Sequence, residues 1–179
     1  SRSLLLPLLE RAQLILVRVL TEDDPRTLPW DLGDNRPALR LLFRLYLAHT
    51  EAGRDEAALT SLHLLMRINP RDHHGIRADL MNHYLRQGED AQALALAQRF
   101  PNDRLVDLAY GEVLALYRQG SSRQAQQALR RAQSHLPLIP RYLTQKRVAR
   151  PRAQAPGPSP DSDETAWFYR ESMLDVWEA

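Results

Sequence analysis

The stretch RQGEDAQA, residues 86–93, decides the fold, because its pattern occurs twice more along the chain. EAGRDEAA at 51–58 and RQGSSRQA at 118–125 also carry a glycine followed five residues later by an alanine. The three joint glycines are Gly53, Gly88 and Gly120. Their separations of 35 and 32 residues match the period of a repeat made of two helices. The chain is therefore predicted to fold as a series of helical hairpins.

The joints also predict how each hairpin turns. Glycine suits the left-handed residue that ends a helix, and a polar residue after it can cap the next helix. The predicted caps are Asp55, Asp90 and Ser121, the last in a capping box with Gln124. A second joint type closes each hairpin, with NPRD at 69–72 and FPND at 100–103. There we expect proline to stop one helix and aspartate to cap the following one.

Apolar residues follow helical spacing from residue 37 to 134, and no run alternates with the period of a strand. With 44% hydrophobic residues among 179, the chain can bury a core. One hairpin cannot cover both of its own faces, so neighbouring hairpins must stack. The predicted fold class is all-α, a right-handed stack of about three antiparallel helix pairs. The first pair is predicted to pack Leu42, Leu45 and Tyr46 against Ala58, Leu62 and Leu65.

In these joints the chain resembles the tetratricopeptide repeat family, over about residues 37–140. A closer resemblance is to repeat proteins that share an early Trp and Arg-Pro, an Asn-Pro-x-Asp-x-x-Gly-x-Arg joint and a late Tyr and Trp helix. The matching structural residues here are Trp30, Arg36, Pro70, Asp72, Gly75 and Arg77. The resemblance implies helical repeats that bind proteins or peptides, and it implies no reaction.

Tetratricopeptide solenoids line their concave surface with the first helix of each pair, so the resemblance implies candidate partner-binding residues. Asn82 falls where relatives that hold a carboxylate carry Asn, but Ala78 stands where they carry a basic residue. We therefore expect a binding face without a complete carboxylate clamp, against the alternative of a solvated face without a ligand. The candidate partner-binding residues are Arg40, Phe43, Asn82, Arg86, Tyr110 and Arg118.

The joint NPRDHHGIR at 69–77 offers a candidate metal cluster in His73, His74, Asp79 and His83. Adjacent histidines point in different directions at a helix start, so we expect exposed polar residues and no metal. Gly75 is predicted to let another helix approach closely. Arg77 would then bond to a carboxylate or to exposed backbone carbonyls of the preceding pair, with ligand contact as the alternative.

No sequence motif indicates catalysis, so we expect neither an enzyme nor a cofactor. Cysteine is absent, which excludes disulfides and thiolate chemistry. Arginines gather in the C-terminal third, from Arg123 to Arg152, and could contact phosphates. The first alternative function is therefore an RNA-binding or ribosome-associated module. Because the chain begins at Ser1, the second is a regulatory domain of a larger enzyme.

Residues 1–36 are predicted to form an N-terminal helix and its connection. The apolar run at 4–20 is interrupted by Pro7, Glu10, Arg11 and Arg18, so we expect a buried amphipathic helix. It lacks the roughly 18 uncharged residues that a membrane span needs, so no membrane partner is expected. Absence of cysteine fits a cytoplasmic location.

The repeats, predicted over 37–145, are followed by a Pro-rich linker at 146–161 and a C-terminal aromatic helix at 162–179. In that helix Ala166, Tyr169, Met173 and Trp177 form one stripe, with Asp161 or Ser162 as cap. We expect the helix to fold back onto the last repeat or into the concave groove. It would act as a permanent cap, as a segment that a partner displaces, or as a site of self-association.

Overall fold

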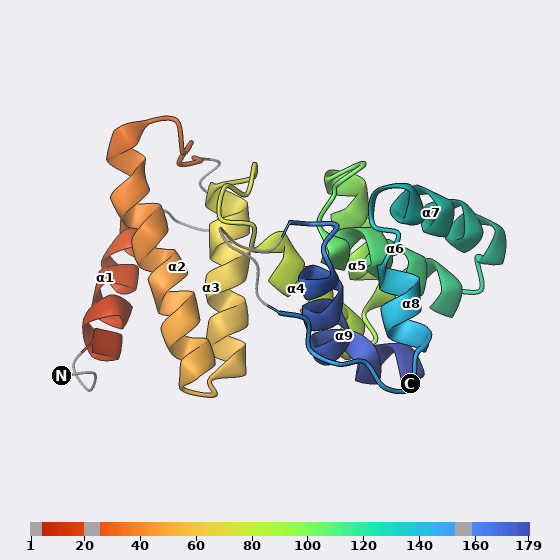
Figure 1. Ribbon diagram of the computed structural model, residues 1–179. Helices are drawn as coiled ribbons and strands as arrows, with labels where there is room; N and C mark the ends of the chain where they lie inside the picture. The colour runs from red at the N-terminus through yellow and green to blue at the C-terminus, as the bar shows by residue number, and fades with distance from the viewer. Residues whose placement is uncertain (1–4, 20–25, 153–158) are drawn as a thin grey trace. The chain divides into compact units, whose positions relative to one another are not determined.

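The computed structural model describes residues 5–19, 26–152 and 159–179, and these residues form an all-α fold (Figure 1). The predicted fold class is confirmed. The chain divides into two compact units, residues 1–76 and 77–179. The predicted linker lies partly outside the described residues, at 153–158. None of the described helices is long and apolar enough to cross a membrane.

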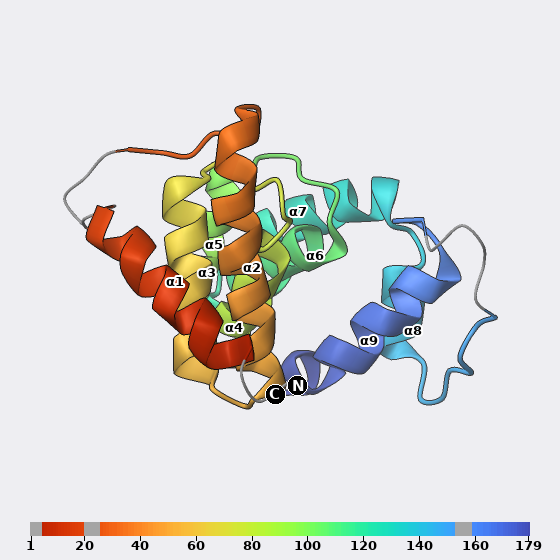
Figure 2. The same cartoon turned by 90° about the vertical axis from the view of Figure 1, so that its left-hand side faces the viewer.

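The first unit contains α1 (Leu5–Val19), the 3-10 turn η2 (Gly33–Asn35), α2 (Arg36–Glu51) and α3 (Asp55–Ile68). Helices α2 and α3 form the predicted first hairpin, and α1 packs against α2 (Figure 2). The predicted core of this hairpin is buried, including Leu42, Leu45 and Leu65 at 0–1% exposure.

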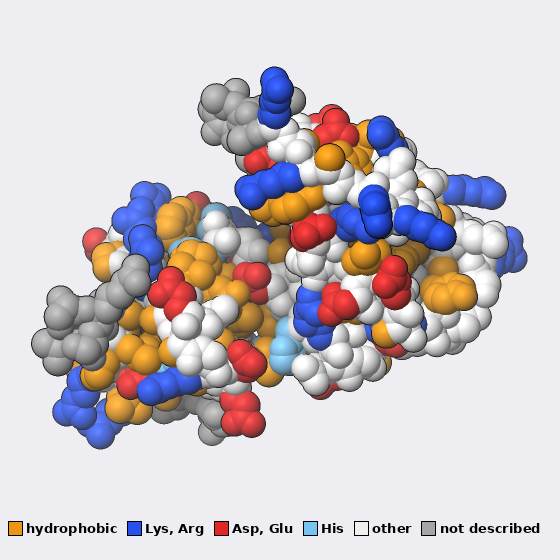
Figure 3. Space-filling model, turned by 60° about the horizontal axis from the view of Figure 1, so that its bottom comes forward, with side chains coloured by type: hydrophobic (Ala, Val, Ile, Leu, Met, Phe, Trp, Pro, Cys, Tyr) orange, Lys and Arg blue, Asp and Glu red, His pale blue; other side chains and the backbone are white. Residues whose placement is uncertain are grey.

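Helix α1 was expected to be buried, and this expectation is wrong for much of its surface. Leu8, Leu14 and Ile15 are each more than half exposed. Glu10 on the same helix accepts a hydrogen bond from Arg54 at 2.8 Å. Hydrophobic side chains are accordingly prominent on the first unit, at the left of Figure 3.

The second unit contains six helices in its described residues. They are α4 (Arg77–Arg86), α5 (Asp90–Arg99), α6 (Val106–Arg118), α7 (Ser122–His135), α8 (Ile139–Thr144) and α9 (Asp163–Glu178). The hairpins α4/α5 and α6/α7 match the predicted second and third pairs, while α8 was not predicted. Helix α9 packs against α8 and also contacts α4 and α6 (Figures 1 and 2).

Glycine is required for two different reasons in this fold: a left-handed backbone conformation at Gly88 and close helix packing at Gly111. The joint glycine Gly88 has a φ of 70°, the left-handed conformation predicted for it. Gly111, inside α6, instead allows close packing, because an added Cβ would lie 2.6 Å from Met81 Cγ on α4. Gly111 thus sets the short separation between the first helices of the second unit's two hairpins.

The predicted caps are wrong in detail. Helices α3 and α5 begin one residue after Arg54 and Glu89, so Asp55 and Asp90 are the first helical residues. Ser121 does occupy the cap position of α7, but no side-chain cap hydrogen bond forms there. At α9 the prediction is confirmed, since Ser162 Oγ accepts a hydrogen bond from the Thr165 backbone N–H at 3.2 Å.

The second joint type organises loops and does not cap helices. Asp72 has a φ of 51°, and its Oδ1 accepts the Ile76 backbone N–H at 3.0 Å, before α4 begins at Arg77. Asp103 acts similarly, accepting the Leu105 N–H at 2.8 Å before α6 begins. The expected role of these aspartates as helix caps is therefore corrected to that of loop residues.

Candidate functional site

Helix α9 carries a continuous buried face into the second unit. Ala166, Tyr169 and Met173 are at most 3% exposed, as the predicted stripe requires. Trp177 completes the stripe, and its indole N–H donates to the Tyr169 hydroxyl at 3.1 Å. Burying one such side chain contributes roughly 1.5–3 kcal/mol, so this face holds α9 in place.

Tyr110 of α6 forms the apolar contact opposite this stripe. Its ring centroid lies 6.2 Å from that of Tyr169 and 6.5 Å from that of Trp177. The phenol is 1% exposed, and its hydroxyl donates to the Leu136 carbonyl at 2.9 Å. Burial raises the pKa of Tyr110 and of Tyr169 above the ordinary value for tyrosine.

Arg118, at the end of α6, joins the ends of three helices. Its guanidinium donates to the Leu85 carbonyl on α4 at 2.9 Å and to the Val176 carbonyl on α9. It also lies 3.7 Å from Asp90 Oδ1, in the first turn of α5. The carbonyls near a helix C-terminus carry partial negative charge. A cation in this position therefore stabilises both α4 and α9.

Arg86, at the end of α4, makes the second polar contact with α9. It donates to the Ser172 carbonyl and to Asp175 Oδ2, the latter at 2.8 Å. The neighbouring guanidinium holds the pKa of Asp175 below its ordinary value through this hydrogen bond. Both arginines thus bind main-chain carbonyls of α9, which any helical segment would offer.

Asn82, on α4, bonds to α6. Its Nδ2 donates to Asp107 Oδ1 at 2.7 Å. Its Oδ1 is buried without a hydrogen-bond partner among the described residues. Burial raises the pKa of Asp107, while the Asn82 hydrogen bond opposes that rise. The contact of Asn82 with Asp107 therefore joins α4 to α6, the first helices of the two hairpins in the second unit.

A second anchor holds the start of α9 against α8. Arg170, only 7% exposed, donates to the Tyr142 carbonyl, and the Tyr142 hydroxyl donates to Asp163 Oδ1 at 2.7 Å. Sequence reasoning missed these residues, as it missed α8. Arg170 is the only cation between residues 163 and 179, and its position beside the apolar stripe was an available signal.

The structure thus brings three candidate partner-binding residues into contact with α9, namely Arg86, Tyr110 and Arg118. The fourth, Asn82, lies on α4 and contacts Asp107 of α6. We call this surface of α4 and α6 the α9 groove. Arg40 and Phe43 belong to the first unit. There the Arg40 guanidinium lies 5.5 Å from the Trp30 ring centroid, and Phe43 stacks on His74 at 4.9 Å.

The early motif residues form a cluster around Trp30. Arg36 Nε donates to the Trp30 carbonyl at 3.0 Å, and its guanidinium lies 5.4 Å from the indole centroid. His73 stacks on the indole at 6.0 Å, and His74 meets it edge-on at 5.0 Å. The two histidines are therefore packed on aromatic rings. The described residues contain no group of three or more side chains that could hold a metal ion.

One expectation about the 69–77 joint is wrong. Gly75 has no heavy atom within 4 Å of an added Cβ, so its φ of 75° is the reason for glycine and close approach is not. Arg77 does bond to a carboxylate, as one of its predicted alternatives requires. Its Nε donates to Asp103 Oδ2 at 2.5 Å in the later FPND joint, and both side chains are largely buried.

A comparison with known families identifies the chain's relatives. The model of the transcriptional repressor TCF25 family matches residues 9–165, most of the chain. The chain belongs to this family. No curated protein and no solved structure matches the chain.

Membership of the TCF25 family corrects the resemblance drawn from the joints. The family is that of transcriptional repressor TCF25 and not a tetratricopeptide-like one. Glycine-punctuated hairpins at a period of about 34 residues follow from helical geometry, so the period alone could not separate these families. The chain is a helical member of a family described as transcriptional repressors.

Proposed function

We propose that this TCF25 family member is a non-catalytic scaffold that binds a helical segment of a partner protein in the α9 groove. The observation that carries the proposal is the binding of α9 main-chain carbonyls by Arg86 and Arg118. Contacts to a helix backbone are independent of sequence, so another amphipathic helix can occupy the same place. Membership of a family named for repression agrees with a role in regulation through partners.

In this proposal α9 is the resident occupant that a partner displaces. Helix α8 ends at Thr144 and α9 begins at Asp163, so 18 residues connect them. A tether of this kind keeps a segment at roughly millimolar effective concentration. A partner helix therefore has to bind more tightly than α9 itself. The predicted absence of catalysis and the predicted cytoplasmic location remain parts of the proposal.

The test uses a labelled synthetic peptide of residues 162–179 and two full-length variants. Met173→Glu places a charge at a position that is 0% exposed and should release α9. We expect the peptide to bind this variant at least about tenfold more tightly than the wild type, since the groove is then open. Glu171→Ala, on the exposed side of α9, is the matched control and should behave as the wild type.

The outcome that contradicts the proposal is a folded Met173→Glu protein that does not bind the peptide. The groove would then be a permanent core. A double variant, Asn82→Ala with Arg86→Ala, should lose capture of partner proteins while circular dichroism still shows a folded chain.

A second candidate, single-stranded nucleic-acid binding, is favoured by one contact. The Arg150 guanidinium lies 5.0 Å from the Trp167 ring centroid and 5.7 Å from that of Phe168. Arginine beside aromatic rings is the combination that stacks on bases. If this candidate is correct, neutralising Arg147, Arg150 and Arg152 should abolish RNA binding, and wild-type binding should weaken steeply with salt.

A further inference from the structure

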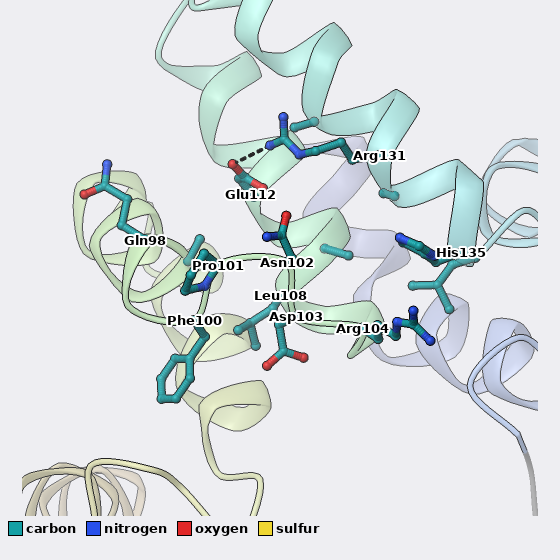
Figure 4. Close-up of a pocket in the computed structure, with 15 residues that line it drawn as sticks. Gln98, Phe100, Pro101, Asn102, Asp103, Arg104, Leu108, Glu112, Arg131 and His135 are labelled. Atoms are coloured by element: carbon teal, nitrogen blue, oxygen red, sulfur yellow. Dashed lines mark hydrogen bonds and ion pairs between the residues drawn. The ribbon is translucent and has the colours of Figure 1, made fainter.

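A second concave surface lies between α5 and α7, on another side of α6 from the α9 groove. Residues two apart on a helix are separated by about 200°, so Glu112 points away from the direction of Tyr110. Glu112 lines a cavity of about 450 Å³ (Figure 4). Its floor is apolar and built from small side chains, among them Ala109 of α6 and Ala132 of α7.

A second cavity of about 450 Å³ lies next to it along α6. Gln98, Glu112 and Arg131 line both cavities, and Arg131 bonds to Glu112 at 2.9 Å. We call the two neighbouring cavities together the α5–α7 groove. It follows α6 from Leu108 to Gln119, which is about 16 Å at 1.5 Å per residue.

The length of the groove and the amides that line it decide what conformation fits. The main-chain N–H groups of an α-helix are already paired within the helix, so only an extended chain has free main-chain donors and acceptors for the glutamines of the groove. An extended chain of about five residues spans the same length at ~3.3 Å per residue. The groove therefore fits an extended peptide.

The charges decide which end of the peptide is acidic. Asp103 is bound to Arg77, and Glu112 to Arg131, so these two carboxylates are already neutralised. Arg104 and His135 line the same end of the groove and are exposed (Figure 4). Among the described residues, neither side chain forms an ion pair with an Asp or Glu. This end can therefore accept a carboxylate through charge-assisted hydrogen bonds.

The other end carries amide side chains. Gln119, Gln124 and Gln127 line it, together with Gln98 at the centre. Each amide offers both donors and acceptors, which is what main-chain N–H and C=O groups of an extended peptide require.

We propose that the α5–α7 groove binds an extended segment of about five residues from a partner protein. An Asp or Glu of the segment bonds to Arg104 and His135, a small apolar side chain lies over Ala109 and Ala132, and the glutamines bond to its main chain. This site is separate from the α9 groove, so one chain holds two partner segments of different conformation.

The test selects displayed random heptapeptides on the full-length protein and then titrates labelled synthetic copies by fluorescence anisotropy. We expect the enriched peptides to share an Asp or Glu at one position. The double variant Arg104→Ala, His135→Ala should weaken their binding about tenfold or more, since two charge-assisted contacts are lost. Gln98→Ala should weaken it less.

Arg130→Ala is the matched control, because Arg130 is an exposed arginine of α7 outside the groove. It should leave the affinity unchanged, as should Arg86→Ala, which affects the α9 groove alone. The proposal is overturned if no peptide is enriched, if enriched peptides lack a shared acidic position, or if the double variant binds them as the wild type does. Loss in Arg86→Ala alone would assign the peptides to the α9 groove. A decamer of single-stranded RNA that binds with the same loss in the double variant would overturn it in favour of nucleic acid.

Discussion

The first helix of a hairpin is covered in two different ways in the two units. On α2, Arg40 is exposed and lies beside the Trp30 ring, and the half-buried Phe43 is partly covered by His74, which stacks on it. Both covering residues lie only six positions from the ends of α2 and α3. On α4 and α6, the equivalent surface is covered by α9, which is joined through 18 residues after α8. A cover on a short connection cannot leave without breaking its hairpin, whereas a cover on a long tether can.

The largest effect that tests this contrast is expected for Tyr110→Ala. The variant removes a ring that is 1% exposed and the contacts of that ring with Tyr169 and Trp177. We expect the free energy of unfolding to fall by about 3–5 kcal/mol, measured by urea denaturation. Tyr117→Ala, on the same helix but 67% exposed, should change it by less than about 0.5 kcal/mol. Equal effects of the two variants would mean that α9 does not depend on Tyr110.

Arg118→Ala should have the next largest effect. It removes charged hydrogen bonds to the carbonyls of Leu85 and Val176, and it takes the nearby cation from Asp90. We expect a loss of about 2–3 kcal/mol in stability, together with faster hydrogen exchange in α9. Arg86→Ala should cost at most about 1 kcal/mol, since that side chain is 40% exposed. If Arg86→Ala lowered stability more than Arg118→Ala, Arg86 and not Arg118 would be the main polar anchor of α9.

Trp30→Ala tests the short-range cover of the first unit. It removes two cation–π contacts of about 0.5–1 kcal/mol each, as well as the ring contacts with His73 and His74. We expect the free energy of unfolding to fall by about 2 kcal/mol, as measured by thermal unfolding. Trp30→Phe should recover part of this stability. The 162–179 peptide should bind this variant no better than the wild type. Improved peptide binding would contradict the conclusion that Trp30 acts only in the first unit and α9 only in the second.

The smallest expected effect is a decrease in stability at acid pH that depends on His74. Burial lowers the pKa of His74, against a raising effect of Asp72, and His73 and Arg40 lower it further. The unfolded chain then takes up this proton more readily, near the ordinary pKa of about 6.5. Stability is therefore complete above that pH and decreases as the pH falls below it. Burial shifts the pKa of His49 in the same direction.

His74→Phe keeps a ring against Phe43 and Trp30 but removes the titration. The loss of stability between about pH 7.5 and about pH 5.5 should be smaller in this variant than in the wild type. Melting temperatures at the two pH values provide the measurement. An unchanged difference would show that His74 does not contribute to acid sensitivity.

Much of the fold could be predicted because hairpins are local. Glycine joints and apolar spacing located α2 to α7, and the stripe of α9 located its buried face. Helix α8 could not be predicted in the same way, since six residues, Ile139–Thr144, are too few for a periodic pattern. The cap errors at Asp55 and Asp90 are shifts of one residue, where helix ends are inherently ambiguous.

The site was predictable in its residue types but not in its pairings. Arg86 and Arg118 were expected to bind a partner segment, yet no sequence pattern relates them to Ser172 or Val176, more than fifty positions later. For the same reason, no sequence pattern pairs Arg77 with Asp103, 26 positions later. Long-range contacts depend on how helices stack, and small packing features such as Gly111 against Met81 determine that stacking.

The hydrogen bond from Trp177 to Tyr169 gives the protein an internal optical reporter. With Tyr110 also beside it, the indole can receive excitation energy from two phenols while α9 is seated. Release of α9 would place this indole in water, shift its emission to the red and end the energy transfer from Tyr110, which stays on α6, while Tyr169 moves with the indole on α9. Occupancy of the groove can therefore be followed in real time in the unlabelled chain.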